Sequence, residues 1–172
     1  MRRTAEDTAL TRAALLAAAL TVFAEQGVTT ARLADVAQRA GVTRGALYHH
    51  FADRTDLYTA VVTDAWETVT APVWATLGDG LAPFQRAWLD HLRQDDRFRS
   101  LLAITVNSGV SLAALPGAAE AKIAGLTDWR DRLRHHLPEQ AADHVIAWMC
   151  GTALLAATDP DLLPTDVEWL AR

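Results

Sequence analysis

The sequence predicts an all-α protein, and three observations support that prediction. The 172 residues include 34 alanines, the strongest helix former. Apolar residues make up 51% and charged residues 22%, which is typical of a globular chain that buries a core without disulfides. Apolar residues also recur at helical spacing, as at Leu16, Leu20 and Phe23.

Glycine, proline and capping residues divide this pattern into successive helices. We expect helices at about 8–26, 31–40, 44–49, 54–77, 82–94, 95–109, 118–136, 139–158 and 165–171, with a loop over 111–117. Gly27 and Gly41 can take the left-handed conformation that ends a helix. Pro72 should kink or end the regular part of 54–77.

Side-chain oxygens stand where these helices should begin. We expect Thr29 or Thr30 to cap 31–40, Thr43 to cap 44–49, and Asp53 to cap the long helix that follows.

Several functional classes lack support in the sequence. Cys150 is the only cysteine, which excludes a disulfide framework and a cysteine-based zinc site. The first residues do not read as a signal peptide, and we expect no membrane span, so the expected location is the cytoplasm. No nucleophile elbow, phosphate loop or dinucleotide fingerprint is present, and His91 and Asp95 lack a third metal ligand. We therefore expect no enzyme activity, no cofactor and no metal.

Residues 31–50 read as two short helices joined by the turn Gly41-Val42-Thr43, the signature of a helix-turn-helix. A plain helical corner without a ligand would show the same pattern. The wedge between the helices is expected to consist of six apolar residues: Val36, Ala37, Ala40, Val42, Leu47 and Phe51.

The outward side of 44–49 favours DNA. If Leu47 points inward, then Arg44, Gly45, Tyr48 and His49 project outward, because they form two i,i+4 pairs. Arginine can pair with guanine O6 and N7, whereas tyrosine and histidine can donate to phosphate, as can Thr43. Charge is consistent with this: residues 1–54 carry +2 and residues 55–172 carry −7, although such a split can also arise by chance.

Residues 8–62 resemble the DNA-binding domain of TetR-type transcriptional regulators. The resemblance rests on the runs 23–30 (FAEQGVTT), 33–37 (LADVA), 40–51 (AGVTRGALYHHF) and 53–57 (DRTDL). It implies a three-helix helix-turn-helix head over residues 1–54 and a helical ligand-binding and dimerisation body over residues 55–172, assembled as a homodimer. It also implies a repressor released from a near-palindromic double-stranded DNA operator by a small organic effector.

The resemblance also assigns DNA-contact positions. They are Thr30, Arg32, Thr43, Arg44, Gly45, Tyr48, His49 and Arg54. Arg54 stands where the family usually has a lysine that touches a phosphate. The body is shorter than is common in the family, which bears on how much of a ligand pocket it keeps.

Six tryptophans mark the expected ligand pocket. An aromatic-walled pocket with polar anchors, as the resemblance implies, would use Trp66, Phe84, Trp88, His91, Phe98, Asn107 and Trp129, with Ser108 as a further anchor. For each aromatic residue alone, ordinary core packing is the competing interpretation.

The segment 139–158 is apolar nearly all round, so we expect it to pack against its counterpart in a second copy. The alternative function is a helical protein that binds small molecules but not DNA.

Overall fold

Every regular element in the described residues is a helix, as the composition predicts. The computed structural model describes residues 5–106 and 117–165. Its elements are α1 (Ala5–Gln26), α2 (Leu33–Arg39), α3 (Arg44–His50), α4 (Arg54–Ala75), the 3-10 turn η1 (Thr76–Asp79), α5 (Leu81–Gln94), α6 (Asp96–Thr105), α8 (Ala118–Arg134), α9 (Glu139–Thr158) and the 3-10 turn η2 (Pro160–Leu162).

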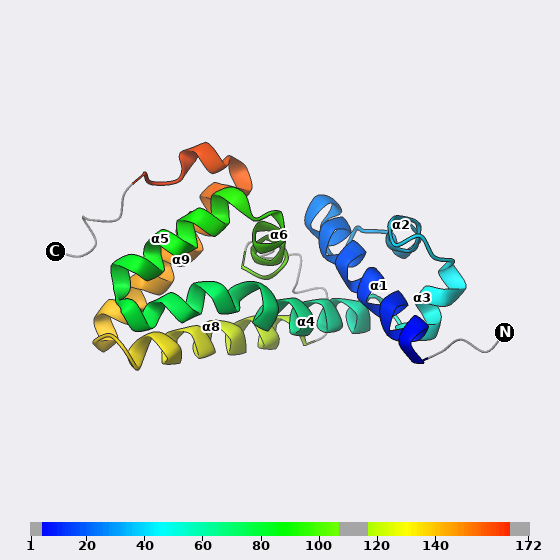
Figure 1. The fold of residues 1–172 in the computed structure, drawn as a ribbon, viewed down its shortest axis with the longest axis horizontal. Helices are drawn as coiled ribbons and strands as arrows, with labels where there is room; N and C mark the ends of the chain where they lie inside the picture. Colours follow the sequence, from blue (N-terminus) through cyan, green and yellow to red (C-terminus); the bar gives the residue numbers. More distant parts are fainter. Residues whose placement is uncertain (1–4, 107–116, 166–172) are drawn as a thin grey trace.

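The helices form a small head and a larger body that share one long helix. Helices α1, α2 and α3 gather at one end, and α4 runs from them along α8 into the body (Figure 1). Helix α6 packs against both α1 and α4, while α9 packs against α5, α6 and α8. The head is therefore joined to the body through α4 and through the contact of α1 with α6.

The beginning of α2 differs from our expectation. The helix begins at Leu33 with Arg32 as its N-cap, and no side chain caps it. The Thr30 hydroxyl instead donates back to the Gln26 carbonyl, closing the end of α1. The expected cap by Thr29 or Thr30 was wrong, because Gly27 (φ 81°) turns the chain so that Thr30 faces the preceding helix.

Other boundaries agree more closely. Thr43 caps α3 and Asp53 caps α4, as predicted. Helix α4 continues through Pro72 to Ala75 and passes into η1, and Gly80 (φ 114°) then ends the turn. The predicted loop at 111–117 and the last helix at 165–171 lie almost wholly outside the described residues.

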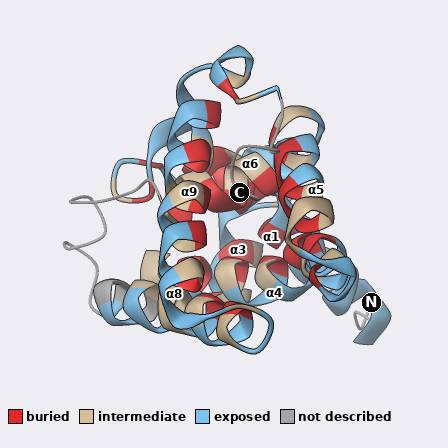
Figure 2. Cartoon of the chain, turned by 90° about the vertical axis from the view of Figure 1, so that its left-hand side faces the viewer, coloured by how far each residue is buried: buried red, intermediate tan, exposed pale blue. Residues whose placement is uncertain are grey.

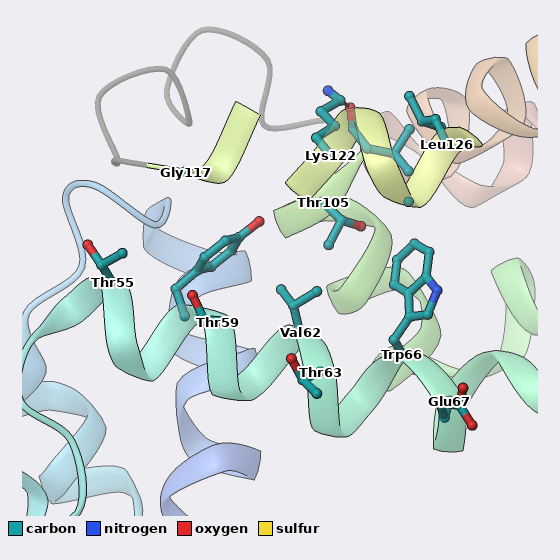
Figure 3. A pocket seen from close by; sticks show the side chains of 13 residues that line it. Thr55, Thr59, Val62, Thr63, Trp66, Glu67, Thr105, Gly117, Lys122 and Leu126 are labelled. Carbon is teal, nitrogen blue, oxygen red and sulfur yellow. Dashed lines mark hydrogen bonds between the residues drawn. The ribbon is translucent and has the colours of Figure 1, made fainter. Parts of the chain in front are cut away.

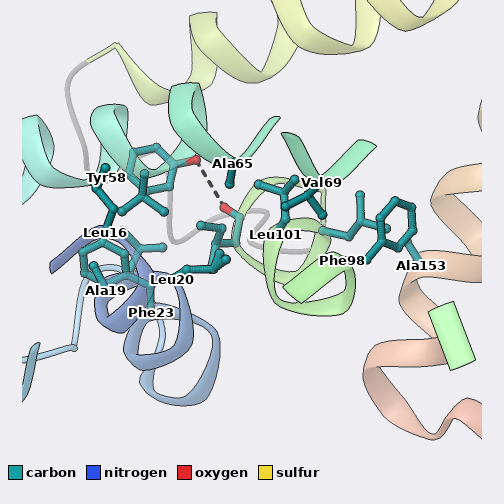
Figure 4. Packing of buried hydrophobic residues seen from close by; sticks show 14 of the residues in the cluster. Leu16, Ala19, Leu20, Phe23, Tyr58, Ala65, Val69, Phe98, Leu101 and Ala153 are labelled. Carbon is teal, nitrogen blue, oxygen red and sulfur yellow. Dashed lines mark hydrogen bonds between the residues drawn. The ribbon is translucent and has the colours of Figure 1, made fainter. Parts of the chain in front are cut away.

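Buried side chains form one continuous core from head to body. Near the head, Leu16, Leu20 and Phe23 of α1 pack against α4 and α6 (Figure 4). In the body, Trp88 and Trp129 are fully buried and meet edge to face at 5.6 Å, and the Trp88 indole N–H donates to the Thr152 hydroxyl at 2.9 Å. This core fixes the direction of α4, which carries the head.

Helices α1 and α9 are each long and apolar enough to cross a membrane by length and composition alone. In α1 that composition supplies the core of the head, since seven of its residues are buried. In α9 the buried residues recur at helical spacing on the side that packs against the body, and exposed residues lie between them (Figure 2).

Candidate nucleic-acid interface and ligand cavity

The corner between α2 and α3 is closed by a glycine turn. Gly41 takes φ 67°, which a residue with a side chain adopts only with strain. The Val42 amide donates to the Ala37 carbonyl at 2.9 Å, and the Thr43 hydroxyl accepts from the Ala46 amide at 3.1 Å. Only four residues, 40–43, therefore separate the end of α2 from the start of α3, and this short turn sets the angle between the helices.

The predicted wedge holds this corner. Val36, Ala37, Leu47 and Phe51 are buried, whereas Ala40 and Val42 are partly buried and pack against the same core. Helix α3 is thus held by one side only.

The other side of α3 is exposed, as predicted. Arg44, Gly45 and His49 are exposed, and Tyr48 keeps 49% of its surface accessible. Thr30 and Arg32, before α2, are exposed as well, as is Thr43. The exposed side of α3 therefore carries the positive charge of Arg44, the polar rings of Tyr48 and His49, and an uncovered backbone position at Gly45.

Arg54 has a different environment from the one expected for a phosphate contact. Its guanidinium donates from Nη2 to the Ala31 carbonyl at 2.8 Å and from Nη1 to the Thr29 carbonyl. These bonds tie the first turn of α4 to the loop between α1 and α2. We call this pair of bonds the Arg54 clasp; spacing alone did not reveal it, and the phosphate contact expected for Arg54 stays a prediction.

Arg12 makes another contact within the head that the sequence pattern did not predict. Its guanidinium lies over the Phe51 ring at 5.4 Å, within cation–π range. This contact joins the exposed side of α1 to the end of α3.

A cavity of about 440 Å³ lies between α4, α6 and α8 (Figure 3). Its lining residues are Thr55, Tyr58, Thr59, Val62, Thr63, Trp66, Glu67, Thr105, Val106, Gly117, Lys122, Gly125 and Leu126. The volume falls within the range of about 300–1,000 Å³ that small-molecule sites occupy.

The cavity includes only Trp66 among the residues expected to bind ligand that the structure describes. Phe84, Trp88, Phe98 and Trp129 are fully buried in the core behind it. Trp66 connects the two regions, since its ring stacks on Trp129 at 5.1 Å. These four rings are buried because they pack against other aromatic rings in the core, so none of them lines the cavity.

The expected polar anchors lie elsewhere. His91 is partly buried, and its Nδ1 is 2.8 Å from the Ala87 carbonyl of its own helix. Asn107 and Ser108 lie outside the described residues.

Titratable groups at the cavity differ in their surroundings. Burial raises the pKa of Tyr58 to about 12, so the phenol stays protonated near neutral pH. Its hydroxyl donates to the Ile104 carbonyl at 3.2 Å. Lys122 is partly buried, and its ammonium donates to the Val106 carbonyl at 2.7 Å, whereas Glu67 is exposed. Over the described residues, no three His, Cys, Asp or Glu side chains gather as a metal site would need.

Helix α9 offers an apolar surface opposite its packed side. Leu154 is 58% exposed and Leu155 is 37% exposed, with Gly151 exposed one turn earlier. Ala142, Val145, Met149 and Thr152 are buried within the body.

The chain is similar to known regulatory proteins in sequence and in fold. A sequence model described as bacterial regulatory proteins of the tetR family matches residues 15–61. The HTH-type transcriptional repressor BepR of Brucella suis is 48% identical over 62 residues, which are 36% of this chain and 30% of BepR. The matched region thus spans about a third of that relative's length.

Solved structures extend the similarity to the body. NalD, the secondary repressor of the MexAB-OprM multidrug efflux pump in Pseudomonas aeruginosa, is 25% identical, with a TM-score of 0.68 over 95% of this chain and 93% of NalD. SmeT, a multidrug efflux pump repressor of Stenotrophomonas maltophilia solved with triclosan, is 28% identical, with a TM-score of 0.67 over 88% of this chain and 82% of SmeT.

The turn between α2 and α3 lies inside the matched residues, and the head and body together reproduce the fold of these repressors. Residues 15–61 therefore match the model of the tetR family of bacterial regulatory proteins, and the chain as a whole is similar in fold to the efflux-pump repressors NalD and SmeT.

Proposed function

We propose that this protein is a ligand-responsive DNA-binding transcriptional regulator, most simply a repressor that a small organic molecule releases from a near-palindromic operator. TetR-family repressors bind operator DNA and small-molecule effectors and act as dimers, and as DNA-binding regulators they are not enzymes and are in general cytoplasmic. The observation that carries the proposal is the exposed side of α3, held by a buried wedge within the residues that match the family.

The exposed side has the chemistry of major-groove reading. Arg44 can donate two hydrogen bonds to guanine O6 and N7, and Tyr48 and His49 can donate to phosphates. Gly45 lets the backbone approach the DNA closely. Thr30, Arg32 and Thr43 border this surface and are further candidate contacts.

A dimer would present two copies of α3 to successive major grooves, about 34–36 Å apart. The exposed apolar side of α9 is the proposed contact between the copies. In this arrangement residues 1–54 form the reading head and residues 55–172 the body, although α4 belongs physically to both.

The effector would occupy the cavity between α4, α6 and α8. Trp66 remains a candidate contact, and the structure adds Tyr58, Val62 and Lys122 from the cavity wall. An effector that fits only when α4 is displaced would change the spacing of the heads. It needs a preference of a few kcal/mol for the non-binding arrangement to release the operator.

Fluorescence anisotropy with an operator selected from the DNA that flanks the gene tests the proposal. Arg44→Ala should weaken specific binding by about 1–3 kcal/mol, or roughly 5–150-fold, and relax the sequence preference. Arg86→Ala removes another exposed positive charge, on α5, and should bind as the wild type does. Unchanged operator binding by Arg44→Ala would refute the assignment of α3.

A further inference from the structure

We propose that the cavity between α4, α6 and α8 selects an elongated amphipathic organic anion, and that Lys122 is the residue that determines this charge preference. The inference rests on the proposed function in taking that cavity as the effector site, and it adds the chemical class of the effector.

The α4 wall of the cavity consists of two parallel rows. Tyr58, Val62 and Trp66 recur every four residues and make an apolar row. The second row is polar and has the same spacing: Thr55, Thr59, Thr63 and Glu67. Residues four apart lie one above another on a helix, so the apolar row extends about 12 Å from Tyr58 to Trp66. This shape suits an elongated molecule with one apolar face and one face that accepts hydrogen bonds.

Lys122 lies across the cavity from these rows, on α8 (Figure 3). Its ammonium carries three donors, and one of them bonds the Val106 carbonyl just beyond the end of α6. That bond fixes the ammonium at the cavity wall. A carboxylate, sulfonate or phenolate in the cavity is the partner that suits its remaining donors.

The two charges that line the cavity are not equivalent. Lys122 is partly buried, whereas Glu67 is exposed to water and salt, which screen its charge more strongly. Tyr58 stays a neutral phenol near neutral pH, because burial raises its pKa to about 12. The cavity therefore favours a negative charge inside it.

The field of Lys122 extends across α8 to α9. Burial raises the pKa of the Cys150 thiol, and the positive charge of Lys122 opposes that rise.

A pair of fluorescent probes separates charge from shape. The anion 8-anilinonaphthalene-1-sulfonate and the neutral N-phenyl-1-naphthylamine share their ring systems and differ in the sulfonate. Titration of each probe into the full chain, without DNA, should show tighter binding of the anion. Quenching of tryptophan fluorescence reports the same site, because Trp66 lines the cavity.

Variants at Lys122 decide the question. Lys122→Gln keeps a donor for the Val106 carbonyl and removes the charge, so it should lose tenfold or more in affinity for the anion and keep its affinity for the neutral probe. Lys122→Arg should retain the preference. Val62→Trp fills the cavity and should weaken both probes, which locates the site. Glu67→Gln should leave the preference for the anion in place.

The outcomes distinguish this proposal from the proposed function. Equal loss of both probes in a folded Lys122→Gln protein, or an unchanged affinity for the anion, would overturn the charge preference. If Lys122→Gln is unfolded by circular dichroism, failure of Lys122→Arg to keep the preference overturns it instead. Arg44→Ala should bind both probes as the wild type does, so a failure to bind operator DNA would not be mistaken for a failure of the cavity.

Discussion

The Tyr58 hydroxyl donates to the Ile104 carbonyl at 3.2 Å, and this bond joins the helix that carries the head to the end of α6 (the dashed line in Figure 4). Tyr58 lines the cavity on α4, and Thr105 and Val106, which follow Ile104, line it at the end of α6. A molecule entering the cavity therefore meets both ends of this link. Because the bond is buried, its loss should be measurable in stability and in ligand response.

Tyr58→Phe should lower the free energy of unfolding at pH 7 by about 1 kcal/mol through loss of that bond. The difference should reverse in alkali. Burial raises the pKa of Tyr58 in the folded protein to about 12, above its usual value of 10.0. The stability that depends on a protonated Tyr58 is therefore fully present below pH 10 and is lost as the pH rises from 10 to 12. By pH 11.5 the wild type should have lost about 2 kcal/mol that Tyr58→Phe keeps.

Urea unfolding at pH 7 and at pH 11.5 measures this reversal. Tyr48→Phe removes the hydroxyl of the exposed tyrosine on α3 and should follow the wild-type profile. A constant difference between wild type and Tyr58→Phe at the two pH values would contradict the prediction.

Substitutions of Arg54 can distinguish its two candidate roles, which are the bonds to the Thr29 and Ala31 carbonyls and a contact with a DNA phosphate. If its bonds to the Thr29 and Ala31 carbonyls position the head, Arg54→Lys should weaken operator binding, because an ammonium cannot span both carbonyls with the geometry of a guanidinium. The salt dependence of binding should stay the same, since no phosphate contact is lost.

If Arg54 instead neutralises a phosphate, Arg54→Lys should bind normally, and Arg54→Met should lower the slope of log K against log salt by about 0.9. Anisotropy titrations at four salt concentrations separate the two results. Arg39→Met is the control for stability, because the Arg39–Glu25 pair is about half exposed and should contribute little.

Gly45→Ala should stabilise the protein and weaken DNA binding at the same time. Within the protein the added Cβ meets only the Thr43 hydroxyl, at 3.8 Å, an ordinary contact. Removal of a helical glycine should therefore add up to about 1 kcal/mol of stability. If the backbone at Gly45 approaches DNA closely, the methyl group should reduce operator affinity tenfold or more.

Gly125→Ala is the matched control for that experiment. Its Cβ would meet Trp66 at 3.8 Å, again an ordinary contact, in a helix of the body. It should raise the thermal midpoint without changing operator affinity. Operator binding by Gly45→Ala at wild-type strength would show that the backbone of α3 does not approach the DNA at this position.

The head could be predicted from the sequence because local signals decide its structure. Gly41 requires a positive φ, Thr43 caps the next helix, and the apolar spacing of Val36, Ala37 and Leu47 places the wedge. Each of these signals acts within a few residues. The exception is Thr30, where a bond back to Gln26 competed with the expected cap and prevailed.

The cavity could not be predicted in the same way, because its walls come from segments far apart in the chain. The aromatic residues indicated a pocket, yet Trp88 packs edge to face on both Trp129 and Phe98 inside the core. Of the tryptophans expected in the pocket, only Trp66, which stacks on Trp129, lines the cavity. Lys122 lines the cavity from α8 and donates to the Val106 carbonyl at the end of α6. The distance of these two residues in the sequence gives no sign of this contact. The i,i+4 rows on α4 were the one signal within the sequence that could have located the cavity.

The exposed apolar side of α9 is the expected contact between two copies of the chain. Leu154→Arg places a charge on a surface that is 58% exposed in the single chain and would be buried between two copies. Burying an unpaired charge is costly, so we expect a folded monomer by size-exclusion chromatography with light scattering at micromolar concentration. Operator affinity should fall with it, because a monomer offers one copy of α3 rather than two.

Leu10→Arg changes a leucine on α1 that is 64% exposed and should leave the dimer intact. A wild-type protein that is monomeric, or a Leu154→Arg protein that stays dimeric, would show that the copies meet elsewhere or not at all.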